Sequence, residues 1–311
     1  MPMTIARPTP HDAGTPDWVT APILSTWRRF IAALACAAAL FVTGCPPSGR
    51  IDLVAEVVPR QIAVDRVNAN AARVTAPLNA RGRVAGYVTD SEGRKRSFNL
   101  AAHLFYLRPC YLSLDLKDDL AGSQFLIGSN ETHYWLNSKP QGDTYWCRRH
   151  DSLIAGRDRD LPINPMELIE ALGLQPVSLD VENPYDAPVQ RIVDEYQQLI
   201  FVGLDPAGQT TIRKEYWLSR RPPFLLSHIV FRDAWGRIEF ASLLSDYRPL
   251  EEGGPMLPTR IEAIWPQSGA SMEFRITRWR AVPTVQPDGP QFTPPHRRGI
   301  TFEQAFIDDA S

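Results

Sequence analysis

The chain lacks the short motifs that mark the common catalytic and nucleotide-binding sites. It contains no HExxH, GxSxG, CxxC or GxGxxG pattern and no GxxxxGK phosphate loop. The sequence therefore predicts a protein that is not an enzyme. A hydrolase remains a lower-ranked alternative, because two carboxylates from separate strands can form a site that no linear motif marks.

Histidines are few and widely spaced. No two of them after the first fifty residues stand at the i, i+2 or i, i+4 spacing typical of metal ligands. They are His103, His133, His150, His228 and His296. We therefore expect neither a metal site nor a cofactor.

Basic runs and long apolar runs are also scarce. No run of lysine or arginine stands out after Arg29, and the formal net charge is -2, so nucleic acid is not an expected partner. Residues 30–42 form one apolar run, which is shorter than the roughly 20 residues that a membrane-spanning helix needs. No other segment approaches that length, so we expect the protein to be anchored to a membrane without crossing it.

The apolar run has the features of a bacterial lipoprotein signal peptide. Arg28 and Arg29 precede it, and Val42-Thr43-Gly44-Cys45 resembles the lipobox before an acylated cysteine. We predict that residues 1–44 are a signal peptide with an N-terminal extension and that residues 45–50 are a lipidated tether. A buried core helix or a short membrane anchor is the alternative interpretation.

Acylation of Cys45, with palmitate among the attached chains, would anchor the protein, since each buried methylene contributes roughly 0.8 kcal/mol. The expected location is the cell envelope, on the periplasmic side. Pro46 follows the cysteine where Asp is a familiar signal for retention in the inner membrane. Its presence favours the outer membrane.

Cysteine is rare, with four residues in the whole chain. Cys36 would leave with the signal peptide and Cys45 would be acylated, so Cys110 and Cys147 remain. Export permits a disulfide between them. Two strand-like segments separate the two cysteines, however, which favours free thiols that behave as small apolar side chains.

Two patterns divide the chain after the tether. Residues 51–74 have the apolar spacing of an amphipathic helix, interrupted by Pro59. From Ala80 onward, apolar and polar residues alternate in short segments, which predicts antiparallel strands with one buried face. We expect strands at 81–89, 96–107, 110–117, 123–128, 131–137, 143–149, from about 190, and at 211–218, 224–232, 237–247, 257–265 and 270–280.

Turn and cap residues support these boundaries. Asp90 to Gly93, Asp205 to Gly208 and Asp233 to Gly236 each place Asp first and Gly fourth, as hairpin turns require. Asn164 to Gly173 combines an N-cap, a proline at the first helical position and a terminal glycine, which predicts a short helix. The proline-rich tail, residues 283–311, is expected to be irregular, with a short helix near 302–307.

This order of elements resembles the LolA/LolB-like superfamily of periplasmic lipoprotein carriers and receptors, over residues 54–282. The segments that carry the resemblance are Arg66 to Asn70, Leu104 to Leu114, Ile127 to Leu136, Leu161 to Ile163, Lys214 to Leu218 and Leu257-Pro258. It implies an α+β, mainly antiparallel domain over residues 51–282. The domain would be a single curved half-barrel sheet of about 11 strands, with helices covering the concave face.

The resemblance also implies a hydrophobic cavity that receives a lipid or lipoprotein acyl chain, in a receptor or transfer role. A structural or protein-interaction lipoprotein with a filled concave face is the alternative, because the alternation of residues is the same in both cases. The expected partners are the membrane, an acyl chain and a periplasmic carrier protein, and the protein is expected to be a monomer. The candidate lining residues are Tyr106, Phe125, Trp135, Trp146, Trp217, Phe231, Phe240, Trp265 and Phe274.

Overall fold

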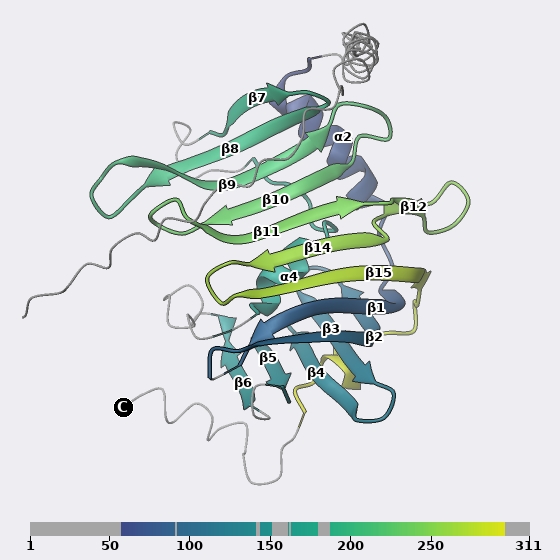
Figure 1. Ribbon diagram of the computed structural model, residues 1–311. Helices are drawn as coiled ribbons and strands as arrows, with labels where there is room; N and C mark the ends of the chain where they lie inside the picture. The colour runs from purple at the N-terminus through teal and green to yellow at the C-terminus, as the bar shows by residue number, and fades with distance from the viewer. Residues whose placement is uncertain are drawn as a thin grey trace, which may run out of the picture. The chain divides into compact units, whose positions relative to one another are not determined.

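The computed structural model describes residues 57–90, 92–140, 144–150, 161, 163–179 and 187–295 (Figure 1). The chain divides into two compact units, residues 1–54 and 55–311, and the described residues all belong to the second. The predicted signal peptide, the lipobox, the tether and the helix near 302–307 lie outside the described residues. No helix among the described residues is long and apolar enough to cross a membrane.

The first half of the sheet is a meander of six strands, and each was predicted from alternation. They are β1 (Leu78–Thr89), β2 (Lys95–Leu107), β3 (Tyr111–Asp118), β4 (Gly122–Ser129), β5 (His133–Ser138) and β6 (Thr144–Arg149). Each strand pairs antiparallel with the next. Alternation locates these strands well because one face of each strand is buried.

The second half adds seven strands to the same sheet. They are β7 (Val189–Val193), β8 (Tyr196–Leu204), β9 (Thr210–Ser219), β10 (Leu226–Arg232), β11 (Ile238–Ser245), β14 (Arg260–Trp265) and β15 (Ala270–Ala281). The short strands β12 (Arg248–Pro249) and β13 (Met256–Leu257) form a separate pair.

The predicted count of about 11 strands is therefore wrong, since the described residues form a sheet of 13. The single strand expected from about residue 190 is the hairpin of β7 and β8. Its turn contains Asp194 at φ 49°, which aspartate tolerates more readily than most residues. No glycine or proline marks this turn in the sequence, so the break was missed.

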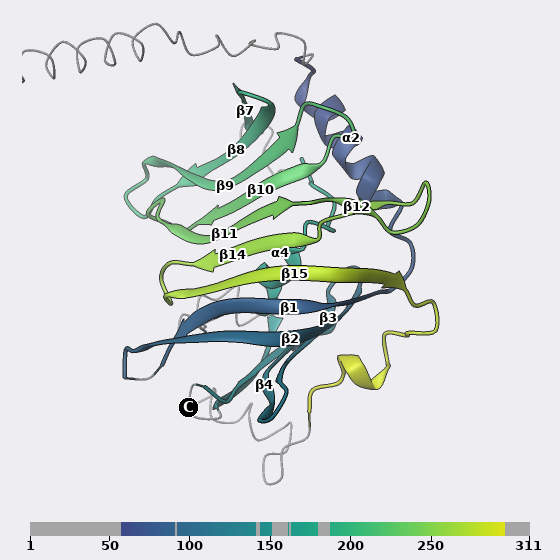
Figure 2. The same cartoon turned by 45° about the vertical axis from the view of Figure 1, so that its right-hand side comes forward.

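Strands β1 and β15 join the two halves. The sheet order is β6-β5-β4-β3-β2-β1-β15-β14-β11-β10-β9-β8-β7, and every neighbouring pair is antiparallel. The sheet curves strongly, so that β3 to β6 turn behind the plane of β14 and β15 (Figures 1 and 2). It does not close into a barrel, because β6 and β7 remain its edges.

The three predicted Asp-to-Gly turns are confirmed. Asp90, for example, accepts hydrogen bonds at Oδ1 from the backbone N–H groups of Glu92 and Arg94, at 3.0 and 2.8 Å. The fourth residues, Gly93, Gly208 and Gly236, have φ values of 77°, 79° and 76°. A residue with a Cβ would be strained at these angles, so the glycines fix the hairpin geometry.

Helix α4 (Pro165–Ala171) is the helix expected before Gly173. The Asn164 side chain accepts a hydrogen bond from the N–H of Met166 at 2.9 Å, and Gly173 ends the segment at φ 65°. The helix contacts β4 and β5 in one half of the sheet and β11 and β14 in the other. It therefore links strands that lie far apart in the sheet order.

Helix α2 (Arg60–Ala72) begins directly after Pro59, so the expected helix from residue 51 is seen in its second part. Two asparagines fasten it. Asn68 exchanges two hydrogen bonds with the backbone of Val177, at 2.8 and 2.9 Å. Asn70 does the same with Met256, at 2.9 and 2.7 Å. Each amide thus pairs with the backbone N–H and C=O of one residue in a distant segment.

The main hydrophobic core lies on one face of the sheet, which we call the inner face. Leu114, Ile127 and Leu136 stand opposite one another on β3, β4 and β5 and have no exposed surface. They belong to the same cluster of buried residues as Leu168 of α4. The inner face is thus the face on which α4 packs.

A smaller apolar group lies on the opposite, outer face. The short helix η2 (Pro290–Phe292) packs on β3, where the rings of Phe292 and Tyr111 are 5.4 Å apart. The Asn130 amide donates a hydrogen bond to the Phe292 carbonyl at 3.2 Å, and Phe292 is 2% exposed. The described part of the tail thus packs on the sheet. The sequence predicted an irregular tail but not this contact.

Replacing Asn70 with alanine should lower the free energy of unfolding by about 1–3 kcal/mol, because the part-buried backbone N–H and C=O of Met256 would each lose a partner. Chemical denaturation measures this change. The matched control is Gln61→Ala in the same helix, where an exposed Gln61–Asp65 bond is lost and less than about 0.5 kcal/mol is expected. Equal losses in the two variants would contradict the role given to Asn70.

Candidate functional site

Seven of the nine candidate lining residues belong to the inner face, and the structure brings several of them into contact. The ring of Phe240 on β11 lies 5.5 Å from Phe231 on β10 and 5.3 Å from Trp265 on β14. Phe240 and Trp265 are buried, and Phe231 is partly buried against the same core. The seven residues are Tyr106, Phe125, Trp146, Phe231, Phe240, Trp265 and Phe274.

The other two candidates lie on the outer face, because each alternates with core residues of its own strand. Trp135 stands between Tyr134 and Leu136 of the core, and its indole covers Gly128 so closely that a Cβ there would overlap the ring. Trp217 contacts His228, with ring centroids 5.1 Å apart. Alternation in the sequence gives two faces but does not say which is concave when both carry aromatic residues.

Ionisable groups also occur on the inner face, and the sequence analysis did not single them out. Lys214 on β9 lies over the rings of Phe231 and Tyr216, at 4.7 and 5.0 Å from their centroids. Burial lowers the pKa of Lys214, while the carboxylate of Glu170 on α4 acts in the opposite direction. Burial raises the pKa of Tyr216, and Glu170 adds to that rise. A lysine at an inward position of an alternating strand is the sequence signal that could have revealed this group.

Glu167 is the second carboxyl group that α4 directs toward the sheet. Its Oε2 accepts a hydrogen bond from the Trp265 indole N–H at 2.6 Å. Burial raises the pKa of Glu167 to about 8, nearby Glu239 adds to the rise, and the Trp265 hydrogen bond opposes it. The inner face therefore holds a carboxyl group that is largely protonated at neutral pH.

An apolar surface with a few converging polar groups is the usual composition of a site for an amphiphilic small molecule. Here the aromatic rings provide the apolar surface, and Lys214, Tyr216, Glu167 and Glu170 provide the polar groups. This composition is the starting point for the proposed function.

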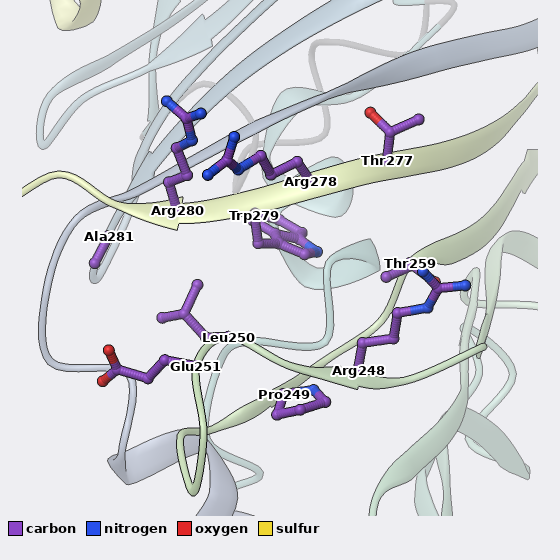
Figure 3. Close-up of a pocket in the computed structure, with 10 residues that line it drawn as sticks. All are labelled: Arg248, Pro249, Leu250, Glu251, Thr259, Thr277, Arg278, Trp279, Arg280 and Ala281. Carbon is purple, nitrogen blue, oxygen red and sulfur yellow. The ribbon is translucent and has the colours of Figure 1, made fainter.

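Two open cavities are lined entirely by described residues, and neither includes any of the nine candidates. The larger, about 490 Å³, lies between β12 and the end of β15. Figure 3 shows Trp279 and Leu250 reaching toward each other across it, with Arg278 and Arg280 on the other side of β15. The smaller, about 390 Å³, lies over β1, β2 and β3.

Both remaining cysteines are free thiols. The Cys110 Sγ donates a hydrogen bond to the Asn130 carbonyl at 3.4 Å, and Cys147 is buried opposite Trp135. Burial raises the pKa of both thiols, which keeps them protonated and unreactive at neutral pH.

No protein-family model matches the chain, and no curated protein sequence matches it. Solved structures similar to it include a DUF1329 family protein from Desulfovibrio piger, with 12% identity, a TM-score of 0.45 and coverage of 74% of this chain and 96% of that one. A LolA superfamily protein from Nitrosomonas europaea has 12% identity, a TM-score of 0.41 and coverage of 73% and 94%. A domain described as a putative outer membrane lipoprotein-sorting domain, from Vibrio parahaemolyticus, has 12% identity, a TM-score of 0.40 and coverage of 73% of this chain and 94% of that one.

One of these structural neighbours is described as a LolA superfamily protein, the superfamily that the sequence resembles. All three TM-scores are below 0.5, and no role for a residue of this chain follows from them.

Replacing Glu167 with glutamine should flatten the pH dependence of stability. The folded state binds this proton more tightly than the unfolded chain, so the contribution of Glu167 to the unfolding free energy is complete below about pH 4.5 and is lost as the pH rises toward 8. Glutamine keeps an acceptor for the Trp265 N–H and does not ionise. Chemical denaturation between pH 5 and 8 measures both slopes, and identical slopes for wild type and E167Q would contradict the assignment.

Proposed function

We propose that the protein is an envelope lipoprotein, anchored through Cys45, that binds a lipid or lipoprotein acyl chain between the inner face of its sheet and helices α2 and α4. The observation that carries the proposal is the composition of the inner face: one open, curved sheet presents aromatic and aliphatic side chains toward α4. The proposed role is that of a receptor or transfer component and involves no catalysis.

The two helices are the proposed cover of the concave face. Helix α4 is short and touches both halves of the sheet. Helix α2 buries only small apolar side chains, Ala63, Val64, Val67 and Ala71, and its asparagines hold it to Val177 and Met256. A helix held by small apolar side chains and a small number of hydrogen bonds can move aside at low cost in free energy, as a cover must.

The energetics suit exchange of a chain between proteins. Burying about a dozen methylenes contributes on the order of 10 kcal/mol before the costs of association. Transfer of the acyl chain is possible where the donor protein binds the chain with a similar free energy. Lys214, beside Glu170 and Tyr216, would then meet the polar end of the ligand, because a partly desolvated amine attracts a carboxylate or an ester carbonyl.

A structural or protein-interaction lipoprotein is the second candidate, and one observation favours it. Tyr106, Phe125, Phe240 and Phe274 are each at most 2% exposed. Other side chains of the protein therefore already cover these rings, as in an inner face that is permanently filled. Binding of an acyl chain then requires that the cover opens, which a ligand titration tests directly.

Delipidated full-length protein should bind a fluorescent fatty acid saturably at micromolar concentration. Phe231→Ala should weaken this binding by about tenfold, because a partly buried ring of the inner face is lost. The matched control is Trp217→Ala, a partly buried aromatic residue on the outer face, for which a change of less than about twofold is expected.

Both variants are first compared with wild type by thermal unfolding, so that loss of folding is not mistaken for loss of binding. Absence of saturable binding by the wild type would favour the structural candidate. Equal weakening by the two substitutions would contradict the inner face as the site.

Replacing Cys45 with serine should abolish incorporation of labelled palmitate in a bacterial host. The thiol is the group that would be acylated, and the hydroxyl of serine does not replace it. Processing of the precursor should also stop, which electrophoresis detects as a larger protein. The control is Cys36→Ser, nine residues earlier and inside the apolar run, which should leave labelling unchanged; continued labelling of C45S would refute the lipobox prediction.

A further inference from the structure

A row of basic residues crosses the outer face where the two halves of the sheet join. Arg81 on β1 stands directly opposite Arg278 on β15 and directly opposite His103 on β2. His103 in turn stands opposite Asp115 on β3. Two residues further along the strands, on the same face, Ala101 stands between Arg83 on β1 and Lys117 on β3.

The smaller cavity lies on this row. Alanine between two long basic side chains leaves a hollow of about 390 Å³, which also involves Arg81, His103 and Thr277. We call this cavity the basic hollow. Arg83 is held in place at its rim, since its Nε and Nη2 donate hydrogen bonds to the side-chain and backbone oxygens of Asn99, both at 3.0 Å.

The positive charge of the basic hollow is only partly compensated by the protein. Asp115 is the one carboxylate in its lining. That carboxylate is already engaged, by the Lys117 ammonium at 2.9 Å and by the Ser123 hydroxyl at 2.7 Å. Arg81 and Arg278 have no hydrogen bond or ion pair from their side chains to any described residue.

Like charges directly opposite on neighbouring strands destabilise a sheet. Burial lowers the pKa of His103, and Arg81 and Lys117 lower it further, while Asp115 opposes them. The net field in the basic hollow is therefore positive. An anion that enters the hollow would relieve the repulsion between Arg81 and its neighbours.

We propose that the basic hollow binds a phosphate-bearing anionic group. Guanidinium and ammonium groups around a small cavity provide the donors that phosphate oxygens prefer. The site lies on the opposite face of the sheet from the inner face, so it is independent of the proposed acyl-chain site.

Two further arginines extend the positive charge beside the basic hollow. Arg278 stands directly opposite Arg81. Figure 3 shows Arg278 and Arg280 on the same side of β15, away from Trp279, which packs in the core. A group larger than free phosphate, such as the headgroup of a phospholipid, could therefore contact these arginines as well.

Calorimetric titration of the detergent-purified full chain tests the proposal with two probes at constant ionic strength. One probe is inorganic phosphate, and the other is glycerophosphoglycerol, the deacylated headgroup of phosphatidylglycerol. Arg81→Gln should weaken binding of either probe by about two- to fivefold, the range expected for one exposed charge pair. Ala101→Leu fills the hollow without changing the charge and should weaken binding at least as much.

The matched control is Arg191→Gln on the edge strand β7, which removes the same charge from an exposed position outside both cavities. It should leave both affinities unchanged. Tighter binding of inorganic phosphate would identify free phosphate as the ligand, and tighter binding of the headgroup would identify a lipid; either supports the site. Affinities in R81Q equal to those in R191Q, or in A101L equal to those of wild type, would overturn it, as would failure of both probes to bind the wild type.

Discussion

The pairing of β1 with β15 is the constraint on which the rest of the structure depends. Each half of the chain forms a meander by local hairpins, and only this pair, distant in sequence, merges the two into one sheet. Gly82 and Gly86 permit the pairing, because a Cβ at either position would overlap backbone oxygens of β15. Without the pair, the two halves would be separate sheets, each with an uncovered apolar face.

A continuous sheet of 13 strands must curve, and the curvature brings distant strands to the same helix. Helix α4 can touch β4 and β11 together only because the sheet bends around it. Ser242 on β11 shows how specific the fit is: its buried hydroxyl donates to the Ala171 carbonyl at the end of α4, at 3.1 Å. Curvature thus brings the inner faces of distant hairpins to the same helix.

Local sequence patterns made much of this fold predictable, and the predictions that were wrong also have local causes. The alternation of Leu112, Leu114 and Leu116 with polar residues located β3, because burial of one face leaves that pattern. The turn at Asp194 was missed because aspartate adopts positive φ without the signal that glycine gives. The candidate site was predicted less well: inward Lys214 was not noticed and outward Trp217 was included, since sequence alternation separates two faces without identifying the concave one.

The bulge at Thr277 determines which side chains at the end of β15 lie on each face of the sheet. Ile276 points into the core, so a regular strand would direct Arg278 inward as well. The extra residue changes this alternation: Trp279 enters the core instead, where its indole N–H donates to the Pro258 carbonyl at 2.9 Å. The same shift places Arg278 outside, directly opposite Arg81. Thr277 donates its hydroxyl hydrogen to the Arg81 carbonyl at 2.9 Å, so one inserted residue both completes the apolar core and brings the two arginines together.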